Sequence, residues 1–444
     1  MSSSISPPPE ILGASASPQF ALADSRFSYW ARTLSKFVTT QLIVQAVGVA
    51  SGILLVRVMN QREYAFFTLA FAMQSTMSIL ADTGIGIGLS SIGGRVWRDP
   101  HRFGQLINTA LRLRRHLAGA AILMVTPILL WMLTRNGASL RYAGLLALLV
   151  LVGLGFQLTT VVLMVVPRLH SQINRVQLLD LVGALARLAV ICTAYFLFLN
   201  AAVAILATVF SIAVQYTLLK RWTPGSIDTG AEESREDRAE ITGIIKSQVP
   251  NSIFYCLQGQ VTVWLIAIFG STQSIAEVGA LGRLGVAFAV VGAVMTSIVL
   301  PGFARCQSPQ QLRQLYFRIV AAFVLFGLAL LTIARIFPDQ LLWILGSKYG
   351  HLRNALLLSM GLTALNSVIT AMWSLNYTKA WIKYSWLNIP AVLIMQALLL
   401  SVLDISTLEG VLWLGILSLV PTLLLNAVLS YRGLTQGSLL TKSA

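Results

Sequence analysis

Residues 78–97 read SILADTGIGIGLSSIGGRVW, and they interrupt an apolar segment with a carboxylate, Asp82, followed by five glycines and an arginine. The spacing Gly84-x-Gly86-x-Gly88 first suggests a phosphate-binding loop. It matches neither a dinucleotide-binding fingerprint nor a Walker loop, and the surrounding sequence predicts no strand–loop–helix unit. We therefore interpret the stretch as the end of a membrane-spanning helix, an interpretation that rests on the composition of the whole chain.

The composition is that of a polytopic membrane protein. Of the 444 residues, 56% are hydrophobic and 11% are charged, with a mean hydropathy of +0.76, whereas a soluble domain carries about 25% charged residues. The net charge of +16 does not indicate nucleic-acid binding, because no basic run is interleaved with stacking aromatics. The three cysteines and four histidines form no disulfide or ligand pattern, so we expect no metal site and no cofactor.

About twelve apolar stretches are long enough for a spanning helix of about 20 residues. Their centres lie near Val47, Gln74, Leu123, Leu154, Ala189, Thr208, Thr262, Val291, Phe326, Thr363, Ile394 and Ile416. We predict an all-α polytopic membrane protein with two parallel-related six-helix lobes around a central cavity. The predicted parts are a disordered or interfacial tail 1–35, an N-terminal lobe 36–219, a linker 220–246, a C-terminal lobe 247–431 and a tail 432–444.

The distribution of basic residues predicts the orientation in the membrane. Most of the 32 Lys and Arg residues fall in the N-terminal tail, the linker and loops on the same side, among them the run RLRRH at 112–116. Because cytoplasmic loops carry an excess of Lys and Arg, both termini are predicted to be cytoplasmic.

The two halves resemble each other in sequence. Glu63 aligns with Glu277 and Pro100 with Pro309, in the same order and at a nearly constant offset. An even number of spans in each half makes the halves parallel, related by an axis along the membrane normal. Transporters are commonly built in this way, with the substrate bound between the halves.

The first helix of each half carries a polar stripe with the same spacing. The stripes consist of Gln41, Gln45, Gly48 and Gly52, and of Asn251, Tyr255, Gln258 and Thr262. Each set shares one helix face, and polar groups are costly in lipid, so both faces are expected to point inward. We predict that Gln41, Gln45, Asn251, Tyr255 and Gln258 bind substrate in a shared hydrated cavity. Hydrogen bonding between packed helices is the alternative.

Five charged residues lie within or at the end of predicted spans. We predict that Arg187, Arg283 and Arg57 bind an anionic group such as phosphate, which guanidinium recognises through paired hydrogen bonds. Arg57 ends its span, where a snorkelling anchor is the alternative. Asp82 and Asp180 are candidates for gating or for binding a coupling proton or sodium. Asp82 has the alternative of pairing with a nearby arginine to hold the fold.

Three segments carry a family resemblance. They are LLVRVMNQREYAFFTLAFAMQSTMSILADTGIGIGLS (54–90), AEVGALGRLGVAF (276–288) and LLWILGSKYGHLRNALLLSMG (341–361). These segments resemble the polysaccharide-transport, O-antigen flippase-type family, the oligosaccharide flippase branch of the multidrug/oligosaccharidyl-lipid/polysaccharide exporter superfamily. The likeness extends over nearly the whole chain from Lys36 onward.

The resemblance implies a flippase of the bacterial inner membrane that is not an enzyme. Such a protein moves a polyprenyl-pyrophosphate-linked oligosaccharide to the outer leaflet by alternating access, for exopolysaccharide, capsule or O-antigen assembly. The arginines would hold the pyrophosphate, and the Gln, Asn and Tyr stripes would face the sugars. The implied partners are the lipid-linked oligosaccharide, the phospholipid bilayer and other polysaccharide-assembly membrane proteins. We expect a monomer and no nucleic-acid partner.

Two other functions remain open from the sequence. A cation-coupled multidrug exporter of the same superfamily would be expected to cluster several acids within one half. A membrane-embedded glycan polymerase or acyltransferase would need general acid–base groups, and no His/Asp/Ser constellation is present in the sequence.

Overall fold

The computed structural model describes residues 39–170, 172–223, 227–228, 230–306, 308–379, 381–382 and 384–440, so the predicted tail 1–35 lies outside the described part. All regular structure in these residues is helical. Ten of the described helices are long and apolar enough to cross a membrane. A broken helical segment at 272–305 and the apolar helix Ser385–Leu400 bring the number of candidate crossings to twelve. The predicted all-α polytopic architecture is confirmed.

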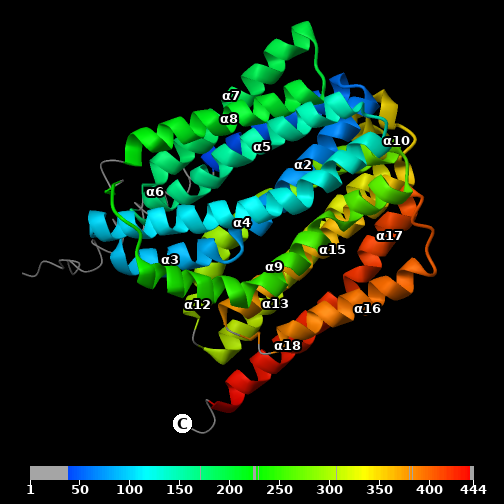
Figure 1. The fold of residues 1–444 in the computed structure, drawn as a ribbon. Coiled ribbons are helices and arrows are strands. Elements are labelled where there is room, and N and C mark those ends of the chain that lie inside the picture. Colours follow the sequence, from blue (N-terminus) through cyan, green and yellow to red (C-terminus); the bar gives the residue numbers. More distant parts are fainter. Residues whose placement is uncertain are drawn as a thin grey trace, which may run out of the picture.

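The N-terminal lobe consists of the first span and seven helices (Figure 1). They are Thr39–Val58, α2 (Gln61–Asp82), α3 (Ile85–Val96), α4 (Pro100–Arg135), α5 (Leu140–Leu163), α6 (Val165–Leu169), α7 (Ile173–Leu197) and α8 (Ala201–Trp222). α5 and α6 together make one crossing. α8 packs along both α5 and α7, and α4 packs along α2 and α5.

The C-terminal lobe contains the remaining helices. They are α9 (Arg235–Phe269), α10 (Thr272–Leu284), α11 (Val286–Val294), η2 (Met295–Val299), α12 (Leu300–Arg305), α13 (Pro309–Ile336), α14 (Pro338–Leu345), η3 (Ser347–Tyr349), α15 (Arg353–Thr378), η4 (Ser385–Leu387), α16 (Asn388–Leu400), α17 (Leu408–Ser418) and α18 (Val420–Leu440). α15 is central because it packs against α13, α17 and α18. The predicted tail from residue 432 continues α18 as far as Leu440.

Short polar side chains fix the starts of several helices. The Asn60 carboxamide oxygen accepts from the second residue of α2, and the Asp99 carboxylate accepts from two amides of α4, which begins with proline. Asn200 and Ser234 do the same for α8 and α9. The first amides of a helix have no intrahelical acceptor, so a cap of this kind typically contributes about 1 kcal/mol.

The stretch 78–97 is a helix break. α2 ends at Asp82, Gly84 adopts a left-handed φ of 77°, and α3 begins at Ile85. A left-handed backbone favours glycine because glycine has no Cβ. A Cβ added at Gly88 would lie 3.0 Å from the Ile241 side chain, so α9 also packs closely here. The glycines of this stretch thus allow both a local break in the helix and close packing against α9.

The aligned glutamates of the two halves occupy corresponding places. Glu63 of α2 accepts hydrogen bonds from the Tyr142 hydroxyl at 2.6 Å and from the Ala201 amide at 2.9 Å. Glu277 of α10 lies 2.9 Å from His351 Nε2, just before α15. Each carboxylate thus ties the second span of its half to the start of the fourth span of that half. These contacts support the internal repeat.

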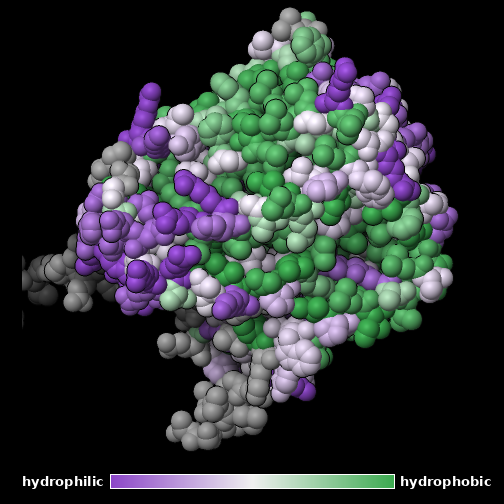
Figure 2. All heavy atoms as spheres, viewed as in Figure 1, coloured by the Kyte–Doolittle hydropathy of each residue, from purple (hydrophilic) through white to green (hydrophobic). Residues whose placement is uncertain are grey.

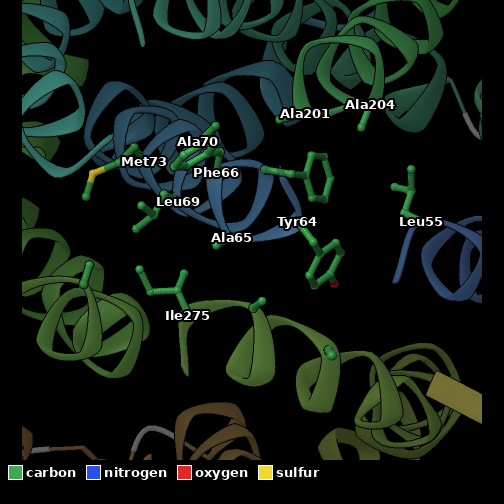
Figure 3. Close-up of a cluster of buried hydrophobic side chains, with 14 of the residues drawn as sticks. Leu55, Tyr64, Ala65, Phe66, Leu69, Ala70, Met73, Ala201, Ala204 and Ile275 are labelled. Carbon is green, nitrogen blue, oxygen red and sulfur yellow. The ribbon is translucent and has the colours of Figure 1, made fainter. Parts of the chain in front are cut away.

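The two lobes meet at the end of the bundle that holds the α4–α5 turn, which we call the hairpin end. Thr272 donates to the Asn136 carboxamide oxygen at 3.1 Å, and Lys348 donates to the Met59 carbonyl at 2.8 Å. Figure 3 shows the apolar contact beneath these bonds, where Ala65 of α2 faces Ile275 of α10. The opposite end, which holds the starts of α4, α9 and α13, is the linker end.

Apolar side chains cover the outside of the bundle. Figure 2 shows a broad hydrophobic band flanked by hydrophilic residues that gather at the linker end on the left and the hairpin end on the right. Many large apolar side chains of the chain are well exposed, including Leu123, Phe196 and Leu325. Such exposure suits hydrocarbon rather than water as the surrounding solvent.

The predicted linker is helical over much of its length. α8 continues to Trp222, and α9 begins at Arg235. Ion pairs fasten the first turns of α9 to the N-terminal lobe: Arg95 to Glu240 at 2.6 Å, and Arg102 to the buried Asp237 at 2.7 Å. The start of α9 therefore belongs structurally to the N-terminal lobe, although the rest of the helix enters the C-terminal one.

A further polar contact at the linker end joins Asp228 to the start of α4. The carboxylate of Asp228 lies 2.9 Å from His101 Nδ1, and its other oxygen accepts from the Gly230 amide at 3.0 Å. The hydrogen bond with His101, followed by that with Gly230, lowers the pKa of Asp228 below its usual value.

Candidate functional site

Arg283 lies at the boundary between the lobes. It occupies the last turn of α10, where the eighth span breaks before α11. Its Nε donates to the Tyr64 hydroxyl of α2 at 3.3 Å, and its guanidinium lies 5.9 Å from the Phe67 ring centroid. A Cβ added at Gly52 would lie 3.1 Å from Arg283 Cδ, so the first span approaches the arginine at a position without a side chain.

Arg187 reaches the same place from the other lobe. It lies midway along α7, and its charge is close enough to repel that of Arg283 and to interact with the Tyr64 hydroxyl. Its Nε and one terminal nitrogen are buried without a hydrogen-bond partner among the described residues. The structure therefore brings together two of the three predicted anion-binding arginines, one from each lobe.

Within the described part of the chain, no carboxylate forms an ion pair with either arginine. A charged group at mid-membrane costs about 2.5–3.5 kcal/mol by insertion scales. The two charges also repel each other, so the arrangement favours an anion with acceptor oxygens for both guanidiniums.

The candidate acids lie elsewhere, beside arginines of their own. Asp82 forms an ion pair with Arg114 of α4, with 3.2 Å between Oδ1 and Nη1, and the Arg114 side chain is only 2% exposed. Asp180 of α7 interacts electrostatically with Arg168 of α6. The alternative in which Asp82 pairs with a nearby arginine is thus observed. Whether either acid binds a coupling ion stays a prediction.

Arg57 binds the protein itself at the hairpin end. Its guanidinium donates to the carbonyls of Trp343 at 2.6 Å and Ile344 at 2.9 Å, at the end of α14, and lies 4.6 Å from the Trp343 ring centroid. The residue joins the first span to the C-terminal lobe. Its predicted role in binding substrate remains a prediction.

The residues of the two predicted polar stripes do not line one cavity together among the described residues. Tyr255 and Gln258 line a cavity of about 480 Å³ within the C-terminal lobe, formed by α9, α15, α16, α17 and α18. Gln41 and Gln45 are half-buried on the first span. The side chain of Asn251 lies outside the described part of the structure. A cavity shared by both stripes therefore stays a prediction.

Two residues that contact the predicted site residues are not identified from the sequence: Arg114, which pairs with Asp82, and Tyr64, which accepts a hydrogen bond from Arg283. The sequence predicts Arg114 to lie in a basic loop at 112–116; this is wrong, because Arg114 is buried inside α4. The signal was periodicity: Phe103, Ile107, Ala110 and Ala118 are buried, and Arg114 falls on the same helix face. No sequence pattern marks Tyr64, because its contact with Arg283 depends on how α10 packs against α2.

Comparisons with known proteins give the fold. No protein-family profile matches the chain, and no curated protein matches it. It is similar to a multidrug resistance MATE family transporter of the MOP superfamily in an inward-facing conformation, with 18% identity, a TM-score of 0.66, and coverage of 92% of this chain and 99% of that one.

Two further structures agree. The MATE multidrug transporter DinF-BH, in a complex, has 18% identity and a TM-score of 0.64, covering 90% of this chain and 94% of that one. A MOP superfamily transporter from Pyrococcus furiosus, described as having a binding pocket of reverse polarity, has 18% identity and a TM-score of 0.57, covering 92% and 95%. This chain therefore has the MATE-like fold of the MOP superfamily of transporters.

Proposed function

We propose that the protein is a flippase that carries a polyprenyl-pyrophosphate-linked oligosaccharide across the membrane between its two lobes. The observation that supports this most is the Arg187–Arg283 pair, one arginine from each lobe, which lacks a carboxylate partner among the described residues. A pyrophosphate offers two adjacent phosphates, and each guanidinium can bind phosphate oxygens through paired hydrogen bonds.

The position of the pair suits alternating access. The arginines come from different lobes, so relative motion of the lobes changes their separation and hence the strength with which they hold one anion. The hairpin end is closed by direct contacts between the lobes. Our proposal places the linker end in the cytoplasm of a bacterium, so this conformation would receive substrate from the inner leaflet.

The proposal includes the setting of the protein. It would work as a monomer in the bacterial inner membrane, with both termini cytoplasmic, and alongside other membrane proteins of surface-polysaccharide assembly. The lipid tail of the substrate would remain in the bilayer while the polar head passes between the lobes.

A cation-coupled multidrug exporter is the second candidate, because two of the similar structures are described as multidrug transporters. The charges within the spans argue against it. Arg114 is paired with Asp82 and Arg168 interacts electrostatically with Asp180, whereas Arg187 and Arg283 repel each other. A cationic drug would meet a net positive site, which opposes binding.

The test is the lipid-linked sugar profile of a deletion strain complemented with variants. The deletion should accumulate a lipid-linked precursor on the cytoplasmic face, and wild type should clear it. Arg187→Ala and Arg283→Ala should leave the precursor in place while the protein remains in the membrane. Arg283→Lys should restore part of the export if charge matters more than paired geometry.

The matched control is Arg353→Ala, which removes an exposed arginine paired with Asp339 at the hairpin end. Its export should equal that of wild type. Full export in both Arg187→Ala and Arg283→Ala would remove the proposal, and so would a deletion strain without an accumulated precursor.

A further inference from the structure

The cavity of the C-terminal lobe differs in chemistry from the arginine pair. Its volume is about 480 Å³, within the range of small-molecule sites. No charged side chain is among its lining residues. The polar lining is made of amides and hydroxyls from five helices, including Gln258, Asn366, Asn388, Gln396 and Ser418.

Two buried polar atoms in this lining have no hydrogen-bond partner among the described residues. Asn388 is 5% exposed and Ser418 is 4% exposed, yet Asn388 Oδ1 and Ser418 Oγ form no hydrogen bond with a described residue. The Asn388 side chain does form a hydrogen bond with Tyr255. Leaving a buried polar group unpaired is unfavourable, because the hydrogen bonds that it makes with water in the unfolded chain are not replaced. Both side chains line the cavity, so a ligand there with hydroxyl groups would satisfy them.

Two further amides of the lining are paired with each other. Gln258 of α9 and Gln396 of α16 exchange two hydrogen bonds, at 3.0 and 2.8 Å. Each carboxamide donates and accepts, so the pair can turn toward a ligand that also does both. Trp373 lines the same cavity, with its ring centroid 6.3 Å from that of Tyr377. An aromatic face beside uncharged amides suits the apolar face and the hydroxyls of a sugar ring.

We propose that the C-terminal-lobe cavity is a binding site for an uncharged saccharide. The inference deepens the proposed function and rests on it for the role in transport, where the cavity would hold the neutral sugars of the substrate whose pyrophosphate the arginines bind. Recognition would then be divided between an anionic site at the lobe boundary and a neutral site within one lobe. An acidic sugar has no cation to pair with among the residues that line this cavity.

The experiment titrates the purified full-length protein in detergent with maltose, as a neutral disaccharide, while tryptophan fluorescence is recorded. We expect a saturable change in wild type, arising from Trp373 in the cavity, and its loss in Trp373→Phe. The other nine of the ten tryptophans are unchanged in that variant, so they report any change that does not come from the cavity. Asn388→Leu and Ser418→Ala should each weaken binding about fivefold, since one hydrogen bond contributes about 1 kcal/mol. Glucuronate should produce no saturable change.

The matched control is Gln157→Leu. Gln157 pairs with Gln74 in the N-terminal lobe at 3.1 Å, as Gln258 pairs with Gln396, and does not line the cavity. Maltose binding should be unchanged in it. Any of three results would overturn the inference. They are the absence of a saturable signal with maltose, a wild-type affinity for maltose in both Asn388→Leu and Ser418→Ala, and saturable binding of a cationic dye in place of maltose. Normal export by the arginine variants with maltose binding intact would instead overturn only the proposed function.

Discussion

The Asp82–Arg114 pair gives the sharpest stability prediction. Arg114 is almost fully buried, with 2% of its side chain exposed, whereas the Asp82 side chain is 43% exposed. Asp82→Asn therefore strands a buried guanidinium, while Arg114→Met removes the buried charge and leaves a half-exposed carboxylate. We expect Asp82→Asn to be the more destabilising change, and the double variant to resemble Arg114→Met alone.

The magnitude follows from the exposure of the two groups. Removing one partner of a fully buried pair costs about 3–5 kcal/mol, and an exposed pair contributes about 0–1 kcal/mol. With one partner buried and the other nearly half exposed, we expect Asp82→Asn to cost about 2 kcal/mol and Arg114→Met about 1 kcal/mol or less. Because the double variant should equal Arg114→Met, the coupling between the two substitutions should match the cost of Asp82→Asn, about 2 kcal/mol.

The assay follows the reaction of Cys256 with a thiol-reactive dye during heating. Cys256 is 1% exposed, so it should react only on unfolding. The other two cysteines, Cys192 and Cys306, are replaced by serine in every variant, since Cys192 is exposed. The apparent Tm should be lowest for Asp82→Asn. A lower Tm for Arg114→Met than for Asp82→Asn, or additive effects in the double variant, would refute the reasoning.

Three further outcomes are expected. Gly52→Val should displace Arg283, because even a Cβ there lies 3.1 Å from its Cδ, and export should fall while membrane levels are retained; unchanged export would contradict this placement. Gly279→Val should lower the apparent Tm, because a Cβ at that position overlaps a threonine of α2; a Tm equal to that of wild type would contradict the close packing of α2 and α10. The Asp228 contact with His101 should hold from neutral pH down to about the unfolded pKa of 3.9, and it should be lost only as pH falls through the lowered pKa of Asp228. Hydrogen exchange in residues 227–234 measures this, and loss of the contact at about pH 6 would contradict it.

Much of the fold follows from the sequence because a bilayer imposes simple rules. Hydrophobic length predicts spans, and the run of glycines after Asp82 predicts a weak point in a helix. The break appears at Gly84, where the backbone is left-handed. The division of the eighth span is harder to foresee, because α11, η2 and α12 together still form one apolar segment, and average hydropathy does not register a π turn.

The candidate site could be predicted only in part. A charge inside a span marks Arg187 and Arg283 as unusual, but one helix does not reveal what lies across from it. Periodicity places Tyr255 and Gln258 on one face of α9, yet that face turns into the C-terminal lobe. Arg114 was misassigned because neighbouring arginines made its segment look like a loop, although its helix position is that of a core residue.

The most direct test of the anion-binding arginine pair is translocation in proteoliposomes. The protein is reconstituted and a fluorescent polyprenyl-pyrophosphate saccharide is incorporated in both leaflets, and loss of its signal to a membrane-impermeant quencher is followed with time. Wild type should move the inner-leaflet half within the assay, and Arg187→Gln combined with Arg283→Gln should leave it protected, as in protein-free liposomes. Translocation by the double variant at the wild-type rate would contradict the account.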